Sequence, residues 1–370
     1  MMMILVYLIL FLYLIYLIWI SEPIFLKDKI ISIKYKPNVS IIISARNEVN
    51  NIANLLDGLI NQTYPDDKYE IIIANDRSTD KTLEILNSYK DKFSNISIIN
   101  IKKTINNWSS KKWALNQCIK KANGEIILQT DADCLHTKYW VDSMVNAFEN
   151  QNTGFVAGPS YIGVKDNFIN ELLKIESLSQ ESFTYANSKR QLYLSCTGRN
   201  IAYRKIVFNE VGGYEDISHI NSGDDDLLLH KITTKTKWNI KFVSDSHTLV
   251  SSYIPNSIKS FYMQRLRYAS KGLLYYNLST PNEVKIILPF IYIANIMCVI
   301  SIFNFIITNS IVWFIPLLFK SIPEIILISK YMSKLKLDFK LLHFIILTIL
   351  HPLYVIILGG IAPFMSVQWK

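Results

Sequence analysis

The chain has 370 residues, of which 50% are hydrophobic and 19% are charged, and its formal net charge is +9. This composition is too apolar for an ordinary soluble enzyme and too charged for a bundle of membrane helices alone. The positive charge does not indicate nucleic-acid binding, because much of the excess lies beside apolar segments, where anionic lipid headgroups are the natural partner. We therefore expect membrane lipids, and no nucleic acid, among the partners.

Four apolar segments are long enough to cross a bilayer at about 20 residues per span. The first, residues 1–22, is expected to be an uncleaved anchor, because it lacks the basic start and the small-residue cleavage site of a signal peptide. The other three lie at about residues 286–308, 311–329 and 342–365. Lys320 and Glu324 interrupt the third segment, which leaves a re-entrant or interfacial segment as an alternative there.

Lysine clusters set the expected orientation in the membrane. One cluster follows the first apolar segment and another separates the last two: Lys27, Lys29, Lys34 and Lys36, and Lys330, Lys334, Lys336 and Lys340. Positively charged loops tend to stay on the cytoplasmic side. We therefore expect a multi-pass protein of the cell membrane whose central domain is cytoplasmic.

Between the apolar ends, short aliphatic runs alternate with helical stretches. The expected strands are residues 39–44, 69–76, 96–100 and 125–133, and the expected helices are residues 48–60, 79–89, 111–122 and 138–150. This alternation predicts βαβ units and a mostly parallel sheet, the Rossmann-like form of an α/β fold. Ligands of such sheets bind beyond the carboxyl ends of the strands. Polar residues follow three of these ends and predict a site: Arg46, Asn47 and Glu48, then Asn75 and Asp76, then Asp131 and Asp133.

The sequence Asp131-Ala132-Asp133 is a candidate metal site. Side chains two residues apart in an extended segment point to the same side, so both carboxylates are expected to face one cation. Magnesium and manganese ions prefer oxygen ligands, and magnesium usually shares its shell with substrate phosphates. The alternative is an ordinary pair of turn or cap residues.

Asp76 and Lys111 are candidate ligand-binding residues. Asp76 ends a strand, and the serine, threonine and aspartate that follow it already offer a helix cap. Asp76 is therefore expected to be free to accept hydrogen bonds from a base or ribose. Lys111 begins a predicted helix and is expected to pair with a phosphate, whereas Lys112 is expected to be solvated.

The sequence Ser222-Gly223-Asp224-Asp225-Asp226 is a candidate general base. Three adjacent carboxylates repel one another, so a structural role alone explains them poorly, although a helix start favours negative charge. An aspartate here is expected to take a proton from an acceptor hydroxyl, with a pKa raised by its neighbours and by partial burial.

Residues 256–280 are expected to form an amphipathic helix in the bilayer interface. One side carries apolar residues, and the other carries Gln264, Arg267 and Lys271. We expect the polar side to close over the ligand site, with Arg267 supplying positive charge to a diphosphate. For Arg265 and Lys271, attraction to lipid headgroups is the alternative.

In this order the motifs resemble the membrane-integrated members of glycosyltransferase family 2, which have a GT-A fold. The similar segments are VSIIISARNE, YEIIIANDRSTDKT, SKKWALNQCIKKANGEIILQTDADC, GDDDLLLHKI and QRLRY, within about residues 38–275. The resemblance implies an inverting transfer of a sugar from a nucleotide-diphosphate sugar, assisted by a divalent magnesium or manganese ion. UDP is the expected nucleotide, with GDP as the alternative.

The resemblance also implies roles for single residues. Those implied in donor binding are Ala45, Asn47, Glu48, Asp76, Lys111, Asp131, Gln264, Arg267 and Tyr268, and those implied in metal binding are Asp131 and Asp133. The catalytic base falls on Asp224, and Asp225 is a second candidate because Gly223 replaces the family's glutamate. Tyr268 replaces the usual tryptophan of the Gln-x-x-Arg-Trp motif, which weakens any prediction of processive chain growth.

The resemblance and the apolar segments together predict four regions. These are an N-terminal transmembrane anchor, a GT-A domain, an interface helix and a C-terminal region of about three transmembrane helices, at residues 1–22, 38–255, 256–280 and 286–366. The expected acceptor is lipid-linked or membrane-proximal. A processive polysaccharide synthase acting on a glycan is one alternative, and a membrane transporter or receptor with a nucleotide-binding domain is an alternative of another class.

Overall fold

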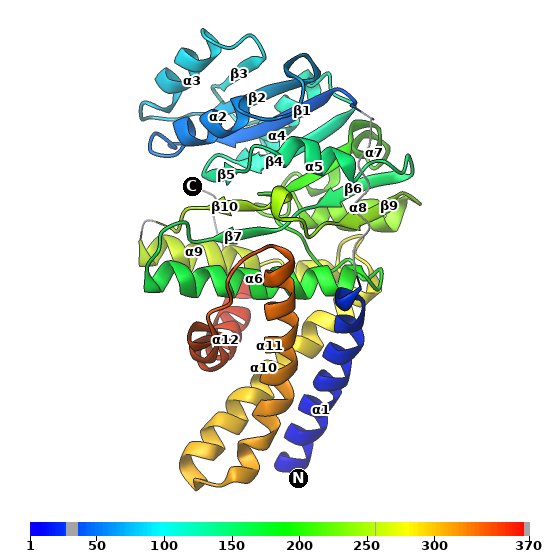
Figure 1. Ribbon diagram of the computed structural model, residues 1–370, viewed down its shortest axis with the longest axis vertical. Coiled ribbons are helices and arrows are strands. Elements are labelled where there is room, and N and C mark those ends of the chain that lie inside the picture. Colours follow the sequence, from blue (N-terminus) through cyan, green and yellow to red (C-terminus); the bar gives the residue numbers. More distant parts are fainter. Residues whose placement is uncertain (27–35, 256, 366–370) are drawn as a thin grey trace. The chain divides into compact units, whose positions relative to one another are not determined.

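The computed structural model describes residues 1–26, 36–255 and 257–365 (Figure 1). Its contacts divide the chain into two compact units. Among the described residues, the unit that we call the helical unit contains residues 1–26, 165–194, 254–255 and 257–365, and the sheet unit contains residues 36–164 and 195–253. The four predicted regions are consecutive segments of the chain, whereas each unit combines several separate segments. The boundaries of the predicted regions stay predictions.

The sheet unit is built on a seven-stranded sheet in the order β3-β2-β1-β4-β8-β6-β9. The strands are β1 (Val39–Ala45), β2 (Tyr69–Asp76), β3 (Ile96–Ile101), β4 (Ile126–Asp131), β6 (Thr153–Ala157), β8 (Ile201–Arg204) and β9 (Asn239–Phe242). The first four are parallel, and β8 runs antiparallel to its neighbours β4 and β6. The mostly parallel α/β fold predicted from the sequence is confirmed.

A second sheet and six α-helices complete the sheet unit within the described residues. The three-stranded sheet has the order β5 (Cys134–His136), β10 (Val250–Ser252) and β7 (Ser160–Ile162). The helices are α2 (Ile52–Ile60), α3 (Thr82–Lys90), α4 (Ser110–Lys121), α5 (Trp140–Asn146), α7 (Lys205–Glu210) and α8 (Asp226–Lys235), with 3-10 turns at Asp66–Lys68, Glu215–Ile217 and Ser246–Thr248.

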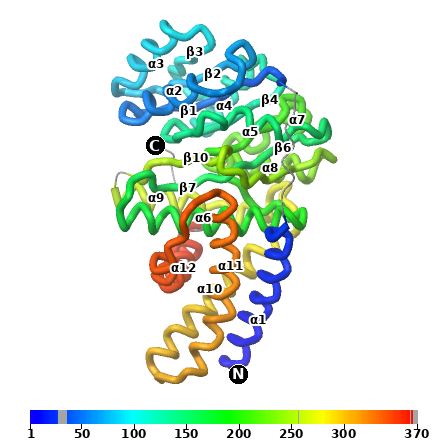
Figure 2. The backbone as a smooth tube through the Cα atoms, in the orientation of Figure 1, coloured from blue at the N-terminus to red at the C-terminus, as the bar shows by residue number. Residues whose placement is uncertain are grey.

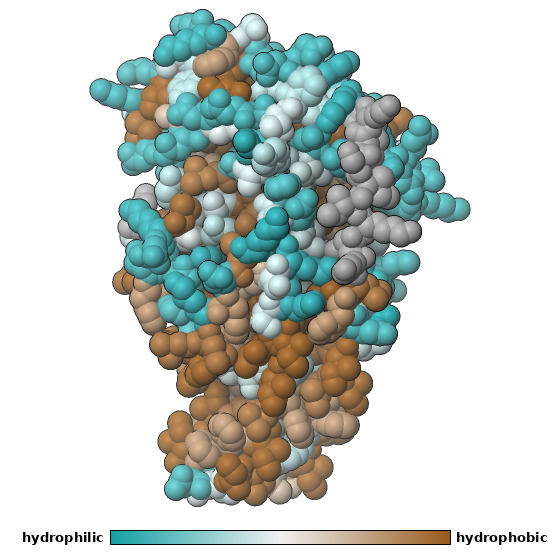
Figure 3. Space-filling view, in the orientation of Figure 1, coloured by the Kyte–Doolittle hydropathy of each residue, from teal (hydrophilic) through white to brown (hydrophobic). Residues whose placement is uncertain are grey.

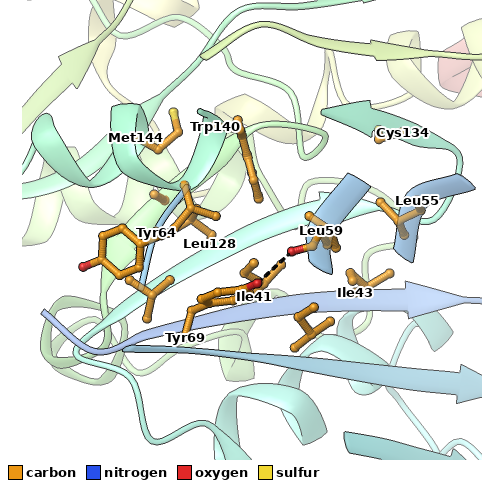
Figure 4. Packing of buried hydrophobic residues seen from close by; sticks show 14 of the residues in the cluster. Ile41, Ile43, Leu55, Leu59, Tyr64, Tyr69, Leu128, Cys134, Trp140 and Met144 are labelled. Atoms are coloured by element: carbon orange, nitrogen blue, oxygen red, sulfur yellow. Dashed lines mark hydrogen bonds between the residues drawn. The ribbon is translucent and has the colours of Figure 1, made fainter. Parts of the chain in front are cut away.

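The core of the sheet unit explains why the aliphatic runs form central strands. Every residue of β1 is buried, as expected for a strand covered by helices on both faces. On one face, Ile41 and Ile43 pack with Leu59 of α2 and Trp140 of α5 (Figure 4). The Tyr69 hydroxyl donates to the Leu59 carbonyl at 3.1 Å, so this phenol is buried with its polar group satisfied.

The helical unit contains six α-helices among the described residues. They are α1 (Met2–Ser21), α6 (Phe168–Ser188), α9 (Ile258–Ala269), α10 (Asn282–Thr308), α11 (Ile315–Lys334) and α12 (Leu341–Ile361), with 3-10 turns at Glu22–Phe25, Leu274–Tyr276, Ile311–Trp313 and Ala362–Phe364. Four of them, α1, α10, α11 and α12, are long and apolar enough to cross a membrane. Figure 3 shows the apolar side chains that these helices present on one face of the unit.

The four apolar helices confirm the predicted segments. α1 lies beside α11, although the two are far apart in the sequence (Figure 2). The interrupted third segment forms one continuous helix of 20 residues, in which Lys320 pairs with Glu324 at 2.7 Å. Lys27, Lys29 and Lys34, on which part of the expected orientation rests, lie outside the described residues, and the cytoplasmic orientation stays a prediction.

Two helices of this unit differ from expectation. The predicted interface helix is shorter than residues 256–280: α9 ends at Ala269, and the chain continues to a separate 3-10 turn. α6 lies within the sequence of the predicted GT-A domain, yet it packs against α11 and α12. Polar contacts fix α6 there, because Tyr354 donates to Glu176 at 2.5 Å and Arg265 of α9 forms an ion pair with the same carboxylate.

Candidate active site

Three strand ends bring the predicted polar residues to one edge of the main sheet. β1 pairs in parallel with β2 on one side and with β4 on the other. In this register Ala45 lies beside Asn75, and Ser44 lies beside Asp131. The structure therefore shows that the loops after these strands leave the sheet side by side, as the alternation of strands and helices predicted.

The loops after β1 and β2 are joined to each other by hydrogen bonds. The backbone amides of Asn47 and Glu48 donate to Ser78 Oγ and Thr82 Oγ1 at 3.1 and 2.9 Å. Asn47 has a φ of 55°, in the left-handed region that asparagine tolerates better than most residues. α2 consequently begins at Ile52 and not at residue 48, because the intervening residues form this loop.

The side chains of this rim are largely used by the rim itself. Asn47 Oδ1 accepts a hydrogen bond from the Thr79 amide at 2.8 Å, and Asp80 accepts from the amides of Val49 and Thr82. Burial raises the pKa of Asp80, but the hydrogen bonds from Thr82 and Val49 outweigh it and lower that pKa. Hydrogen bonds therefore join the loops after β1 and β2 into one edge, which we call the braced edge. Because its side chains bond to each other, this edge has mainly backbone groups to offer a ligand.

Asp76 lies in this edge and already has a protein partner, and its role in binding a ligand stays a prediction. Its carboxylate is fully buried and accepts two hydrogen bonds from Arg77, from Nε at 2.8 Å and from Nη2 at 3.1 Å. Arg77 Nη2 also donates to Ser110 Oγ at 2.7 Å, which links this edge to the start of α4. A carboxylate has about four acceptor positions, so this pairing fixes its orientation and still allows a further donor.

Lys111 is the centre of the site. Its ammonium lies 2.9 Å from Asp131 Oδ1 and 3.0 Å from Asp224 Oδ2, and the lysine side chain is 13% exposed. Burial alone lowers the pKa of Lys111, but Asp131, Asp224 and Asp225 outweigh it and hold that pKa above its ordinary value. Lys111 is therefore a cation that joins a carboxylate at the end of β4 to one in the loop before α8.

Asp224 is held by neutral donors as well. Gln129 of β4 donates from Nε2 to Asp224 Oδ2 at 2.8 Å. The hydroxyl of Tyr214 lies within hydrogen-bond distance of Gln129 Oε1 and of the Asp224 carbonyl, at 3.1 and 3.2 Å. Both the side chain and the backbone of Asp224 are thus fixed by residues that are themselves buried.

The contacts of Asp225 differ from those of Asp224. Asp225 Oδ1 accepts from the amide of Asp226 and caps α8, while Oδ2 accepts from the amide of Gly198 at 2.7 Å. The sequence left both aspartates as candidates for the base. Asp225 holds two backbone segments together, whereas Asp224 reaches the lysine that also binds Asp131.

The expected geometry around Asp133 is wrong. β4 ends at Asp131, and Ala132 and Asp133 form a turn before β5, so no extended segment runs through the pair. The described residues contain no cluster of three or more His, Cys, Asp or Glu side chains placed to hold a metal ion. Two carboxylates suit a magnesium-type ion that takes its remaining ligands from water and from substrate phosphates.

Four residues of the site were not identified from the sequence. Gln129 and Tyr214 bind Asp224, and Gly198 faces it so closely that a Cβ would lie 3.0 Å from Asp224 Oδ2. Lys112 was expected to be solvated, yet it is 1% exposed, with its ammonium bonded to backbone carbonyls before Asp224. Adjacent helix residues point in different directions, so one of the two lysines can be buried while the other is exposed. The sequence alone did not show which lysine points inward.

The predicted donor residues of the interface helix belong to the helical unit. Arg267 lies over the ring of Tyr268, with its guanidinium carbon 5.7 Å from the ring centroid. Gln264 is half-buried and Tyr268 is exposed. Arg265, for which lipid headgroups were the alternative, is buried and pairs with Glu176. Closure of α9 over the site stays a prediction.

Comparisons with known proteins give a family and relatives with glycosyltransferase names. Residues 40–212 match the family described as Glycosyl transferase family 2. The probable glycosyltransferase YdaM of Bacillus subtilis (strain 168) is 27% identical over 241 residues, which cover 64% of this chain and 56% of that protein. A relative from Methanococcus voltae, named dolichyl N-acetyl-alpha-D-glucosaminyl phosphate 3-beta-D-2,3-diacetamido-2,3-dideoxy-beta-D-glucuronosyltransferase, is 28% identical over 249 residues, 64% of this chain and 73% of its own.

A solved structure extends the likeness to the whole chain. The mannosyltransferase PcManGT from Pyrobaculum calidifontis, in complex with GDP-Man and Mn²⁺, superposes with a TM-score of 0.65 over 98% of each chain at 18% identity. At that identity the likeness shows the fold alone, which is a GT-A-like domain with one N-terminal and three C-terminal apolar helices. Residues 40–212 of the chain thus carry a domain that matches glycosyl transferase family 2, and the relatives bear glycosyltransferase names.

Proposed function

We propose that the chain transfers one sugar from a UDP-sugar to a lipid-linked acceptor, with inversion at the anomeric carbon. The observation that carries the proposal is Lys111, which binds Asp131 on the donor side and Asp224 on the acceptor side. A nucleotide-sugar donor suits the braced edge formed by the loops after β1 and β2. In this proposal Ala45, Asn47, Glu48 and Asp76 line the nucleoside part of that edge.

A divalent cation is part of the proposal. Asp133, together with Asp131, would hold the ion, and the diphosphate would supply further oxygen ligands. When bound, the ion neutralises the negative charge of the departing nucleoside diphosphate. Lys111 contributes in the same direction, because its pKa is held above the ordinary value and its ammonium stays charged at neutral pH.

Asp224 acts as the general base. As the acceptor hydroxyl attacks the anomeric carbon, its proton moves to the Asp224 carboxylate, the new C–O bond forms, and the bond to the diphosphate oxygen breaks. Lys111 and Gln129 both bind Oδ2, so they fix the position of that oxygen. One displacement of this kind inverts the anomeric configuration.

The acceptor hydroxyl is proposed to belong to a lipid-linked or membrane-proximal molecule. Four helices long and apolar enough to cross a membrane support an acceptor at a membrane, and the name of the Methanococcus voltae relative denotes transfer to a dolichyl-linked sugar. The transporter alternative depends on charged groups inside the spans. Of these, Lys320 and Glu324 pair with each other within α11, and Tyr13 of α1 donates to Glu324, which favours a role in fastening α1 to α11.

The test is sugar transfer by the purified protein in lipid nanodiscs. A panel of labelled UDP- and GDP-sugars is supplied with manganese and a membrane lipid extract, and the products are sized. The proposal predicts that one UDP-sugar gives a lipid product with a single added sugar, and that Asp133→Asn gives none. A ladder of long products would instead show a processive synthase, and transfer from GDP-sugars alone would correct the nucleotide.

A further inference from the structure

We propose that Lys112 is a positioning residue that holds the loop of Asp224 in place, an inference that rests on the proposed function. Lys112 lies in α4 directly after Lys111, and its side chain is almost completely buried. Its ammonium donates to the carbonyls of Ile220 and Ser222 at 2.6 and 2.7 Å. These two carbonyls belong to the segment that ends at the candidate base.

The start of α4 is bound to this segment at further points. The amide of Ser109 donates to the Ser218 carbonyl at 2.7 Å, and Ser218 Oγ donates to the Asn107 carbonyl at 3.2 Å. Lys112 therefore completes a set of contacts between residues 107–112 and residues 218–222. Because Lys111 on the same helix contacts Asp131 and Asp224, α4 holds both the base and the chain that carries it.

The backbone conformation between Ser222 and Asp224 carries the constraint from the Lys112 hydrogen bonds to Asp224. Gly223 has a φ of 84°, a left-handed conformation that turns the chain sharply. A Cβ on Gly223 would lie 2.5 Å from Leu227 side-chain atoms, so the turn is tightly enclosed. With the Ser222 carbonyl fixed on one side and α8 beginning at Asp226 on the other, few backbone positions remain open to Asp224.

The chemistry of Lys112 indicates more than filling space. Burying an ammonium costs free energy unless its donors are bonded, and well-packed apolar residues often replace a whole buried ion pair without loss of stability. A lysine at this place is therefore best explained by what its hydrogen bonds fix. Misplacing a catalytic group by about 1 Å can reduce turnover by about 100-fold.

The test compares Lys112→Met with Lys112→Arg and with the control Lys205→Met in the full-length protein. Lys205 also donates from Nζ to a backbone carbonyl of the sheet unit, at 2.5 Å, but its acceptor is Ala122, at the opposite end of α4 from Lys112. We expect Lys112→Met to lower kcat by about 10- to 100-fold while KM for the donor stays unchanged. Hydrogen exchange of residues 218–224 is expected to accelerate, and Lys112→Arg to restore part of kcat.

The outcomes separate the inference from the proposed function. A lower Tm for Lys112→Met with unchanged kcat per folded molecule and unchanged exchange at residues 218–224 would overturn the inference alone. So would equal losses of kcat in Lys112→Met and Lys205→Met. Wild-type turnover in Asp224→Asn would overturn the proposed function and the inference together. If Lys112→Met fails to fold, the same measurements are made on Lys112→Gln, which keeps a donor on a shorter chain.

Discussion

Buried charges are arranged differently in the two units. In the helical unit two buried cations each pair with one carboxylate: Arg265 pairs with Glu176, and Lys320 pairs with Glu324. A tyrosine hydroxyl completes each pair, from Tyr354 and Tyr13 respectively. In the sheet unit Lys111 is shared between two carboxylates, from β4 and from the loop before α8.

This difference distinguishes ion pairs that hold helices together from a charged site that suits a ligand. A closed pair, in which one charge cancels the other and the remaining acceptors are filled, fixes helices to one another and offers little to a ligand. A lysine shared by two carboxylates leaves the local charge unbalanced towards negative, which suits a cation and, through it, a diphosphate. Changes in the sheet unit are therefore expected to alter catalysis, and changes in the helical pairs to alter stability.

The largest expected effect is the loss of activity in Asp133→Asn. Removing this carboxylate takes away a ligand of the cation that neutralises the leaving diphosphate, so we expect transfer to fall by about 1,000-fold or more. Initial rates across a manganese titration measure it. The control is Asp142→Asn, because Asp142 pairs with Lys36 on the same unit and has no proposed catalytic role. Equal rates in the two variants would remove Asp133 from the site.

The next effect distinguishes Asp224 from Asp225. Asp224→Asn is expected to lower kcat by about 100- to 10,000-fold, as loss of a general base does, with little change in Tm. Asp225→Ala is expected to remove the cap of α8 and to cost about 0.5–2 kcal/mol of stability. Kinetics and thermal unfolding of both variants provide the comparison. The reverse pattern would move the base to Asp225.

In the helical unit, Arg265→Met is expected to cost about 3–5 kcal/mol of stability, because it leaves Glu176 as an uncompensated buried charge. The double change Arg265→Met with Glu176→Met is expected to recover most of that loss. Unfolding in detergent, followed for Arg265→Met, Glu176→Met and the double variant, measures the coupling. Two losses that simply add would show that the pair is not closed.

A smaller effect is expected for Gly198→Ala. The added Cβ would lie 3.0 Å from Asp224 Oδ2 and 3.3 Å from Gln129 Nε2, so both side chains must shift. We expect kcat to fall by about 10-fold with a preserved fold, since overpacking of this size costs about 1–3 kcal/mol. Kinetic constants and a far-UV circular dichroism spectrum measure both. An unchanged kcat would show that Asp224 tolerates displacement.

The smallest expected effect is the contribution of Lys111 to the pH dependence. Its pKa is raised in the folded protein, so the stability that it contributes is complete below its unfolded value of about 10.4 and is lost only above that pH. The pH–rate profile of the wild type should therefore show no loss from this group between about pH 7 and 10. A descending limb in this range that disappears in Lys111→Met would contradict the assignment.

The sequence predicted the sheet and the edge of the site because both follow from local patterns. Runs such as the buried β1 must form central strands, and parallel pairing then brings Ala45 and Asp131 to one edge. The sequence did not reveal that Lys112 is buried, because its place depends on a loop about 110 residues away. For the same reason it did not reveal α6 as part of the helical unit, since Glu176 meets its partners only in the folded chain.

The central claim is that Asp131, Lys111 and Asp224 form one site for a nucleotide diphosphate and a cation. The most direct measurement is calorimetric binding of UDP to the purified protein with and without manganese, repeated for Asp133→Asn. We predict that manganese strengthens UDP binding by at least about 10-fold in the wild type, or about 1.4 kcal/mol, and has no effect in the variant. Equal binding of UDP in all four conditions would contradict the account.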